Sequence, residues 1–149
     1  MSAMTHQYDL IEATKENPMT TTLTGTEIRP MIVPQNLTDA DAADFLDMIE
    51  VRNQVMREVS GHDDHAMTAA ELLPHYQPDE YNERFCWVIV ADGRIVGRAN
   101  CDLPTEEGSR VAYWLVEVIR EAQGRGLGRQ AYALVEATAR EHGRTVLQA

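Results

Sequence analysis

The chain has 149 residues, 44% hydrophobic and 25% charged, which is the composition of one globular domain and excludes general disorder. Its formal net charge of −11 excludes a nucleic-acid partner, which would require clustered Lys and Arg. The chain has neither a signal-peptide pattern nor the ~20 consecutive apolar residues of a membrane span, so we expect a cytoplasmic protein without a membrane partner.

The first 25 residues are polar, lack periodicity and include the helix-unfriendly pair Asn17-Pro18. We therefore predict a flexible N-terminal extension over residues 1–25 and one folded domain over residues 26–149. Residues 27–34 are the first strand candidate. Pro30 has no N–H to donate to a neighbouring strand, which places this strand at the edge of the sheet.

Two helices are predicted next along the chain. Thr38 and Asp41 fit an N-cap with a capping-box carboxylate, and Gly61 ends the helix that they would begin. Residues that recur at intervals of three or four form a mostly apolar stripe along this helix: Phe45, Met48, Ile49, Arg52, Val55, Met56 and Val59. A shorter helix is predicted over residues 68–75.

A β-hairpin is predicted where two runs of β-forming residues, 84–91 and 94–101, flank Asp92-Gly93. This dipeptide tolerates the two positive φ angles of a type I′ turn. The two strands should therefore be antiparallel neighbours.

The hairpin contains both cysteines of the chain, too few for a disulfide framework. A two-residue turn would place Cys86 opposite Ala99 and Cys101 opposite Arg84. The cysteines would then lie diagonally on one face, ~7–8 Å apart, which suits a disulfide poorly. We expect reduced thiols.

The C-terminal part is predicted to form a strand over residues 110–118, a helix from Leu127 to Gly143 and a strand over residues 144–149. The complete order is β-α-α-β-β-β-α-β, which defines an α/β chain with a mixed sheet. Because the last helix is a crossover, the strands that it joins should be parallel neighbours.

Three alternating glycines, Gly124, Gly126 and Gly128, lie between a predicted strand and a predicted helix. Glycine allows positive φ and close backbone approach, and the first amides of a helix attract anions. A pyrophosphate fits such a turn, with Arg125 or Arg129 adding hydrogen bonds. The sequence lacks the Lys-Ser/Thr of a P-loop and the spacing of a dinucleotide fold. A purely steric need for glycine is the remaining alternative.

Residues 116–128 resemble the acyl-CoA signature of the GNAT superfamily, and residues 27–149 follow the element order of that family. The resemblance implies a mostly antiparallel mixed sheet with flanking helices, and acetyl-CoA as co-substrate. It implies that the following residues bind the cofactor: Val116, Glu117, Val118, Gln123, Gly124, Arg125, Gly126, Leu127, Gly128 and Arg129.

The resemblance also implies transfer of the acetyl group to an amine of a small molecule or peptide by direct attack. The Val118 amide would be the oxyanion donor. Glu117 resembles a glutamate that acts as general base in some relatives; the alternative is a solvated strand residue. Arg120 departs from the proline usual in the family. A CoA-binding or scaffolding domain without catalysis is the alternative function.

The family fold continues for another helix and two strands, so we expect a GNAT domain truncated after its fifth strand. The general acid of the family has no position in this sequence. A further chain segment or a second GNAT domain would complete the fold near residues 145–149, and a homo-oligomer is also compatible. Alone, the chain is expected to be unstable or inactive.

Three other groups of residues have simpler interpretations. Residues 62–65, His-Asp-Asp-His, are interpreted as a polar loop that caps a helix, so no metal site is predicted. His142 is expected to contact the carbonyls at a helix end. Four aromatic residues are expected mostly in the core: Phe85, Trp87, Tyr113 and Trp114.

Overall fold

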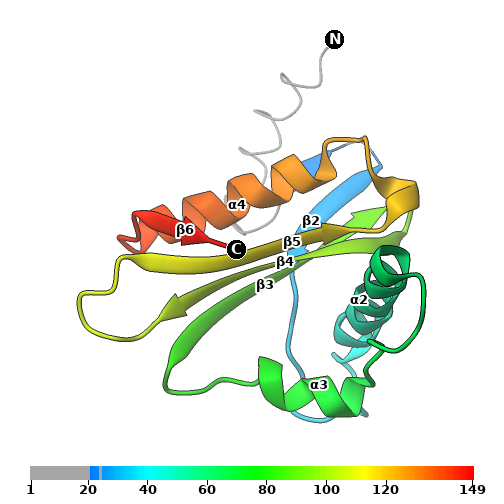
Figure 1. Ribbon diagram of the computed structural model, residues 1–149, viewed down its shortest axis with the longest axis horizontal. Coiled ribbons are helices and arrows are strands. Elements are labelled where there is room, and N and C mark those ends of the chain that lie inside the picture. The colour runs from blue at the N-terminus through cyan, green and yellow to red at the C-terminus, as the bar shows by residue number, and fades with distance from the viewer. Residues whose placement is uncertain (1–20, 24) are drawn as a thin grey trace.

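A six-stranded sheet in the order β1-β2-β3-β4-β5-β6 forms the centre of the molecule (Figure 1). The computed structural model describes residues 21–23 and 25–149. Neighbouring strands are antiparallel except β5 and β6, which are parallel, as the crossover predicted. The strands are β1 Thr21–Leu23, β2 Thr26–Pro30, β3 Asn82–Ala91, β4 Arg94–Pro104, β5 Val111–Val118 and β6 Val146–Gln148.

The helices are α2 Ala43–Ser60, α3 Ala69–Tyr76 and α4 Leu127–Glu141, with a short 3-10 helix, η2, at Arg120–Ala122. From β2 onward, the helices and strands confirm the predicted element order. No helix among the described residues is long and apolar enough to cross a membrane.

The first predicted strand is β2, and its placement at the sheet edge was wrong. Thr21–Leu23 pairs with it as β1, with Thr21 opposite Ile28. Pro30 is nevertheless tolerated, because β1 pairs with β2 only as far as Ile28 and no described strand lies opposite Pro30 on that side. On the other side Pro30 lies opposite Trp87 of β3. Residues 1–20 of the predicted extension lie outside the described residues.

The long helix was predicted correctly, but its N-cap was not. The cap position is Ala42, which makes no side-chain hydrogen bond, and the Asp39 carboxylate accepts from the Asn36 amide instead. Asp44 in the first turn accepts two hydrogen bonds from Arg29 of β2, at 3.0 and 2.9 Å. This pair anchors the helix start to the sheet, and an acidic side chain there also suits the helix dipole.

Most of the predicted stripe of α2 packs inward, with Phe45, Met48, Ile49 and Val55 buried and Val51 joining them. Val59 in the last turn is 79% exposed, so the stripe ends before the helix does. Gly61 ends the helix in the left-handed conformation, as predicted. Helix α3 starts from Thr68, which forms a capping box with Glu71.

The predicted hairpin is present, and both Asp92 and Gly93 have positive φ. Its predicted register was wrong, because a β-bulge after Ile89 shifts the pairing by one residue. Cys86 therefore lies opposite Asn100, and Cys101 lies opposite Phe85.

A shift of one residue moves a side chain to the other face of a sheet, so the two cysteines lie on opposite faces. Cys86 and Cys101 are both buried and free. The expected reduced thiols are confirmed, for a reason different from the predicted one.

Helices cover both faces of the sheet (Figure 1). On one face Tyr132 of α4 packs against Trp114 of β5. On the other face the Tyr76 hydroxyl of α3 accepts a hydrogen bond from Arg98 of β4, and α2 lies beside α3. Trp87 is buried as expected, whereas Tyr113 is 46% exposed and lies outside the core.

Gly97 should be irreplaceable by any residue with a side chain, because β4 and β5 approach each other closely there. An added Cβ would lie 2.6 Å from the Glu117 carbonyl oxygen and 2.9 Å from Ile89 Cδ1. We expect Gly97→Ala to lower the free energy of unfolding by ~1–3 kcal/mol, measured by urea denaturation. The control is Gly128→Ala, whose Cβ meets nothing closer than 3.9 Å. Equal stability of the two variants would contradict this packing.

The buried thiols should be unreactive in the folded protein. Burial raises the pKa of Cys86 to about 12 and that of Cys101 to about 11, from 9.0. At pH 8 we expect Ellman's reagent to label neither thiol until guanidinium unfolds the chain. The thiols lose their protons at a lower pH in the unfolded chain than in the folded chain. The free energy of unfolding should therefore fall as pH rises from 9.0 through these values. Rapid labelling of the native protein would contradict the burial.

Candidate functional site

A groove of about 370 Å³ lies between the end of β5 and the start of α4. Its lining contains most of the residues predicted for the cofactor: Val116, Val118, Gln123, Gly124, Gly126, Leu127, Gly128 and Arg129. Ala122 also lines it and was missed, because an alanine carries no chemical signal. Glu117 and Arg125 are not in the lining.

The glycine loop gives this groove a backbone wall. Gly124 and Gly126 have φ angles of 84° and 80°, which only glycine adopts without strain. Gly126 is the N-cap of α4, no side chain caps the helix, and its first turn contains no acidic residue. The first helical amides are therefore available to an anion, because an α-helix leaves them without internal partners.

The open edge of β5 forms the second wall. β6 pairs with β5 only from Val111 to Tyr113. The Ile119 amide donates to the Val96 carbonyl of β4 at 2.9 Å, so the alternate residues Val116 and Val118 direct their peptide groups away from β4.

Two contacts agree with this direction. The Val146 amide of β6 donates to the carbonyl of Arg110. Arg110 is an even number of residues from Val118, so the peptide groups of both residues point to the same side of the strand. Gln123 Nε2 donates to the Val118 carbonyl at 3.0 Å. The amides of Val116 and Val118 thus face the side where the sheet opens, and they can pair with an extended ligand.

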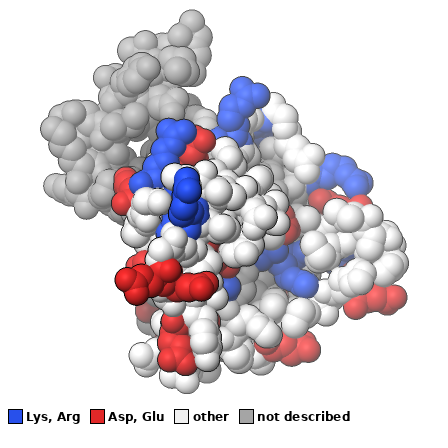
Figure 2. Space-filling model, turned by 60° about the vertical axis from the view of Figure 1, so that its left-hand side comes forward, with Lys and Arg blue, Asp and Glu red and all other residues white. Residues whose placement is uncertain are grey.

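The two arginines of the loop differ in their surroundings. Arg129 lines the groove, whereas Arg125 forms an ion pair with Asp92 of the β3–β4 turn at 3.1 Å. Both partners of that pair are well exposed. Basic and acidic side chains are interspersed with broad neutral areas on the face shown in Figure 2.

Glu117 lies on the opposite face of β5 from the side chains of Val116 and Val118. Its Oε1 accepts from Arg98 Nη2 at 2.8 Å, and Arg98 Nη1 donates to Tyr76 Oη at 2.7 Å. The Arg98 and Glu117 side chains are only 9% and 14% exposed. The alternative of a solvated strand residue was therefore wrong.

Sequence reasoning missed the partners of Glu117. Arg98 follows the apolar run Ile95-Val96-Gly97 and precedes Ala99, which was the available signal. Among the described residues, Arg98 Nε and Glu117 Oε2 are buried and make no hydrogen bond.

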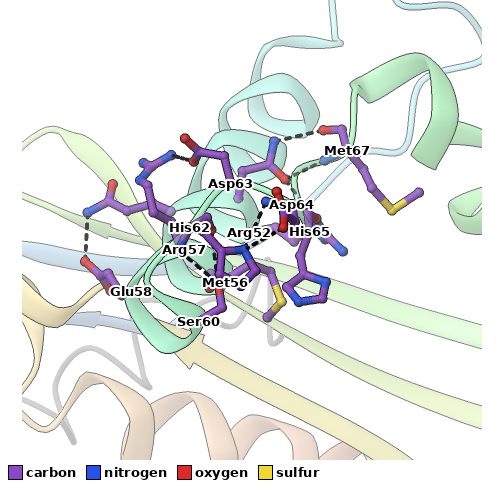
Figure 3. Close-up of polar contacts among 12 residues, drawn as sticks. Arg52, Met56, Arg57, Glu58, Ser60, His62, Asp63, Asp64, His65 and Met67 are labelled. Carbon is purple, nitrogen blue, oxygen red and sulfur yellow. Dashed lines mark hydrogen bonds and ion pairs between the residues drawn. The ribbon is translucent and has the colours of Figure 1, made fainter.

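The segment from His62 to His65 forms a polar loop after α2 (Figure 3). Asp63 pairs with Arg57 at 3.0 Å, the Asp64 amide donates to His62 Nδ1 at 3.3 Å, and the two histidine rings lie 5.4 Å apart. No group of three or more metal-binding side chains occurs in the described part of the chain. His142 Nδ1 contacts the Thr138 carbonyl at 2.8 Å, as expected at a helix end.

Comparison with known proteins identifies the class of protein that this fold and groove define. The acetyltransferase (GNAT) family model matches residues 47–149, and the chain belongs to this family. The family uses acetyl-CoA as the acetyl donor. A search of curated proteins found no match.

Solved structures share the fold at low identity. A tandem GNAT protein from the clavulanic acid biosynthesis pathway has a TM-score of 0.61 and 22% identity over 82% of this chain and 35% of its own. The chain therefore spans about a third of that protein's length. The yncA protein of Salmonella typhimurium, solved with its cofactor acetyl-CoA, has a TM-score of 0.60 and 23% identity over 83% of this chain and 68% of its own.

A third similar structure is the aminoglycoside acetyltransferase meta-AAC0020 from an uncultured soil metagenomic sample, in complex with sisomicin. It has a TM-score of 0.60 and 17% identity, and the match covers 85% of this chain and 78% of that protein.

Proposed function

We propose that the chain binds acetyl-CoA in the groove between β5 and α4 and transfers its acetyl group to an amine. The observation that supports this most is the meeting of two sets of free amides in one groove. The start of α4 offers amides to a pyrophosphate, and the edge of β5 offers amides to an extended pantetheine arm.

The Val118 amide is the proposed oxyanion donor. It faces the open edge of β5, whereas the Val118 carbonyl is occupied by Gln123. A thioester carbonyl beside β5 would accept from this amide, which stabilises the negative charge of the tetrahedral intermediate.

Glu117 is proposed to accept the proton that the amine loses during attack. Its Oε2 is buried and has no hydrogen bond among the described residues, so it is an unpaired acceptor that an amine or a bridging water would satisfy. The side chain lies on the face of the sheet covered by α2 and α3, so donor and acceptor would approach the edge of β5 from different sides.

A substitution at Gly128 should separate cofactor binding from folding. Gly128 lies in helical backbone with Val116 Cγ1 3.9 Å from an added Cβ, so Gly128→Leu suits the helix and fills the groove. We expect the Kd for acetyl-CoA, measured by calorimetry, to rise by roughly tenfold or more, about 1.4 kcal/mol.

The matched control is Ala133→Leu, which adds the same side chain on the exposed face of the same helix. It should leave the Kd unchanged. Unchanged affinity in Gly128→Leu, with the wild-type protein binding acetyl-CoA, would place the cofactor elsewhere.

Glu117→Gln should slow acetyl transfer while sparing cofactor affinity. General-base catalysis typically contributes ~10²–10⁴-fold, so a fall in kcat within that range is expected. Thiol release from acetyl-CoA is measured with spermidine, tyramine and a lysine-containing peptide as acceptors. Glu107→Gln, in an exposed loop, is the control.

The assay also tests the alternative function. If acetyl-CoA binds but no acceptor accelerates thiol release, the domain binds CoA without catalysis. If kcat is the same in Glu117→Gln as in the wild type, Glu117 is not the base.

A further inference from the structure

Two cross-strand ion pairs on the same face of the sheet differ in how the arginine binds the carboxylate. Arg84 of β3 binds both carboxylate oxygens of Asp102 on β4, with Nε to Oδ1 at 2.8 Å and Nη2 to Oδ2 at 3.0 Å. Arg98 of β4 binds only one oxygen of Glu117 on β5, through Nη2. The first pair is bidentate and complete, and the second is not.

Tyr76 accounts for this difference. Arg98 directs Nη1 to the Tyr76 hydroxyl, and that hydrogen bond is buried. The Tyr76 ring is itself held by edge-on packing against Phe45 of α2, with ring centroids 5.6 Å apart. The guanidinium is thereby fixed between a helix and a strand, in a position where Nε and Glu117 Oε2 do not bond each other.

The Arg98–Glu117 pair is expected to contribute little to the stability of the fold. A buried ion pair gains little over well-packed apolar residues, and each buried polar atom without a partner adds a cost. The same arrangement suits orientation, since burial together with the bond from Arg98 restricts the rotation of the Glu117 carboxylate. The second oxygen is a buried acceptor without a partner among the described residues.

We propose that Arg98, anchored by Tyr76, is a positioning residue that holds Glu117 Oε1 so that Oε2 faces the acceptor amine. The proposal rests on the proposed acetyl transfer and deepens it. Arg98 is not in the lining of the cofactor groove, so it is expected to act through Glu117. Its loss should therefore change turnover without changing the affinity for acetyl-CoA.

The test is a double-mutant cycle in the full chain, with thiol release from acetyl-CoA as the readout and the best of the three amines above as acceptor. Arg98→Lys keeps the charge but has only one ammonium for the two contacts. We expect kcat to fall by roughly tenfold to a hundredfold, because misplacing a catalytic group by about 1 Å can cost 10²-fold. The Kd for acetyl-CoA should stay within about twofold of the wild-type value.

In the Glu117→Gln background, Arg98→Lys should cause no further loss, because a positioning residue has nothing left to position. The matched control is Arg29→Lys, the same change in the bidentate Arg29–Asp44 pair between β2 and α2, and it should leave kcat near the wild-type value. Tyr76→Phe removes the anchor hydroxyl and keeps the ring. Tyr76→Phe should lower kcat by less than Arg98→Lys does. If Arg98→Lys does not fold, the fall in kcat of Tyr76→Phe tests the positioning role instead.

The outcomes separate this proposal from the proposed function. If the wild-type chain releases no thiol with any amine, both are overturned. If the wild type is active and the losses from Arg98→Lys and Glu117→Gln multiply, or Tyr76→Phe leaves kcat unchanged, only the positioning role is overturned. Equal losses in Arg29→Lys and Arg98→Lys would show that loss of any arginine pair on the sheet lowers kcat, and would also overturn the positioning role.

Discussion

The candidate site depends on where the pairing between β5 and β6 stops. β6 pairs with Val111–Tyr113, and beyond that point the side of β5 that faces away from β4 has no strand partner among the described residues. Val116 and Val118 direct their amides to this side. Backbone amides need hydrogen-bond partners, so an opened edge beside a groove favours an extended ligand that supplies them.

The glycine loop places a second set of donors at the end of the same edge. After β5 the chain turns through η2, and Gln123 closes this turn on the Val118 carbonyl. The positive φ angles of Gly124 and Gly126 then let α4 begin directly beside Val118. One groove therefore contains strand amides suited to an amide-bearing arm and helix amides suited to a diphosphate.

The charged pair Arg98–Glu117 lies on the face of the sheet opposite to α4. Arg98 links Tyr76 of α3 to Glu117 of β5, the strand that borders the groove. The side chains of Val116 and Val118 point to the α4 face and that of Glu117 to the α2–α3 face, so the proposed cofactor and acceptor functions would occupy opposite sides of one strand. Period-two alternation makes this separation possible within three consecutive residues.

The sequence by itself determined the element order from β2 onward, the Asp92-Gly93 turn and the glycine loop, because each depends on local backbone preferences or on a short periodic pattern. It also indicated most of the residues that line the groove, although Ala122 was missed and Glu117 and Arg125 lie outside the lining. Only the tertiary structure decided the register beyond the bulge at Ile89, the pairing of β1 with β2, and the burial of Glu117 against Arg98. These depend on contacts between residues far apart in the chain, where a shift of one residue reverses every side chain.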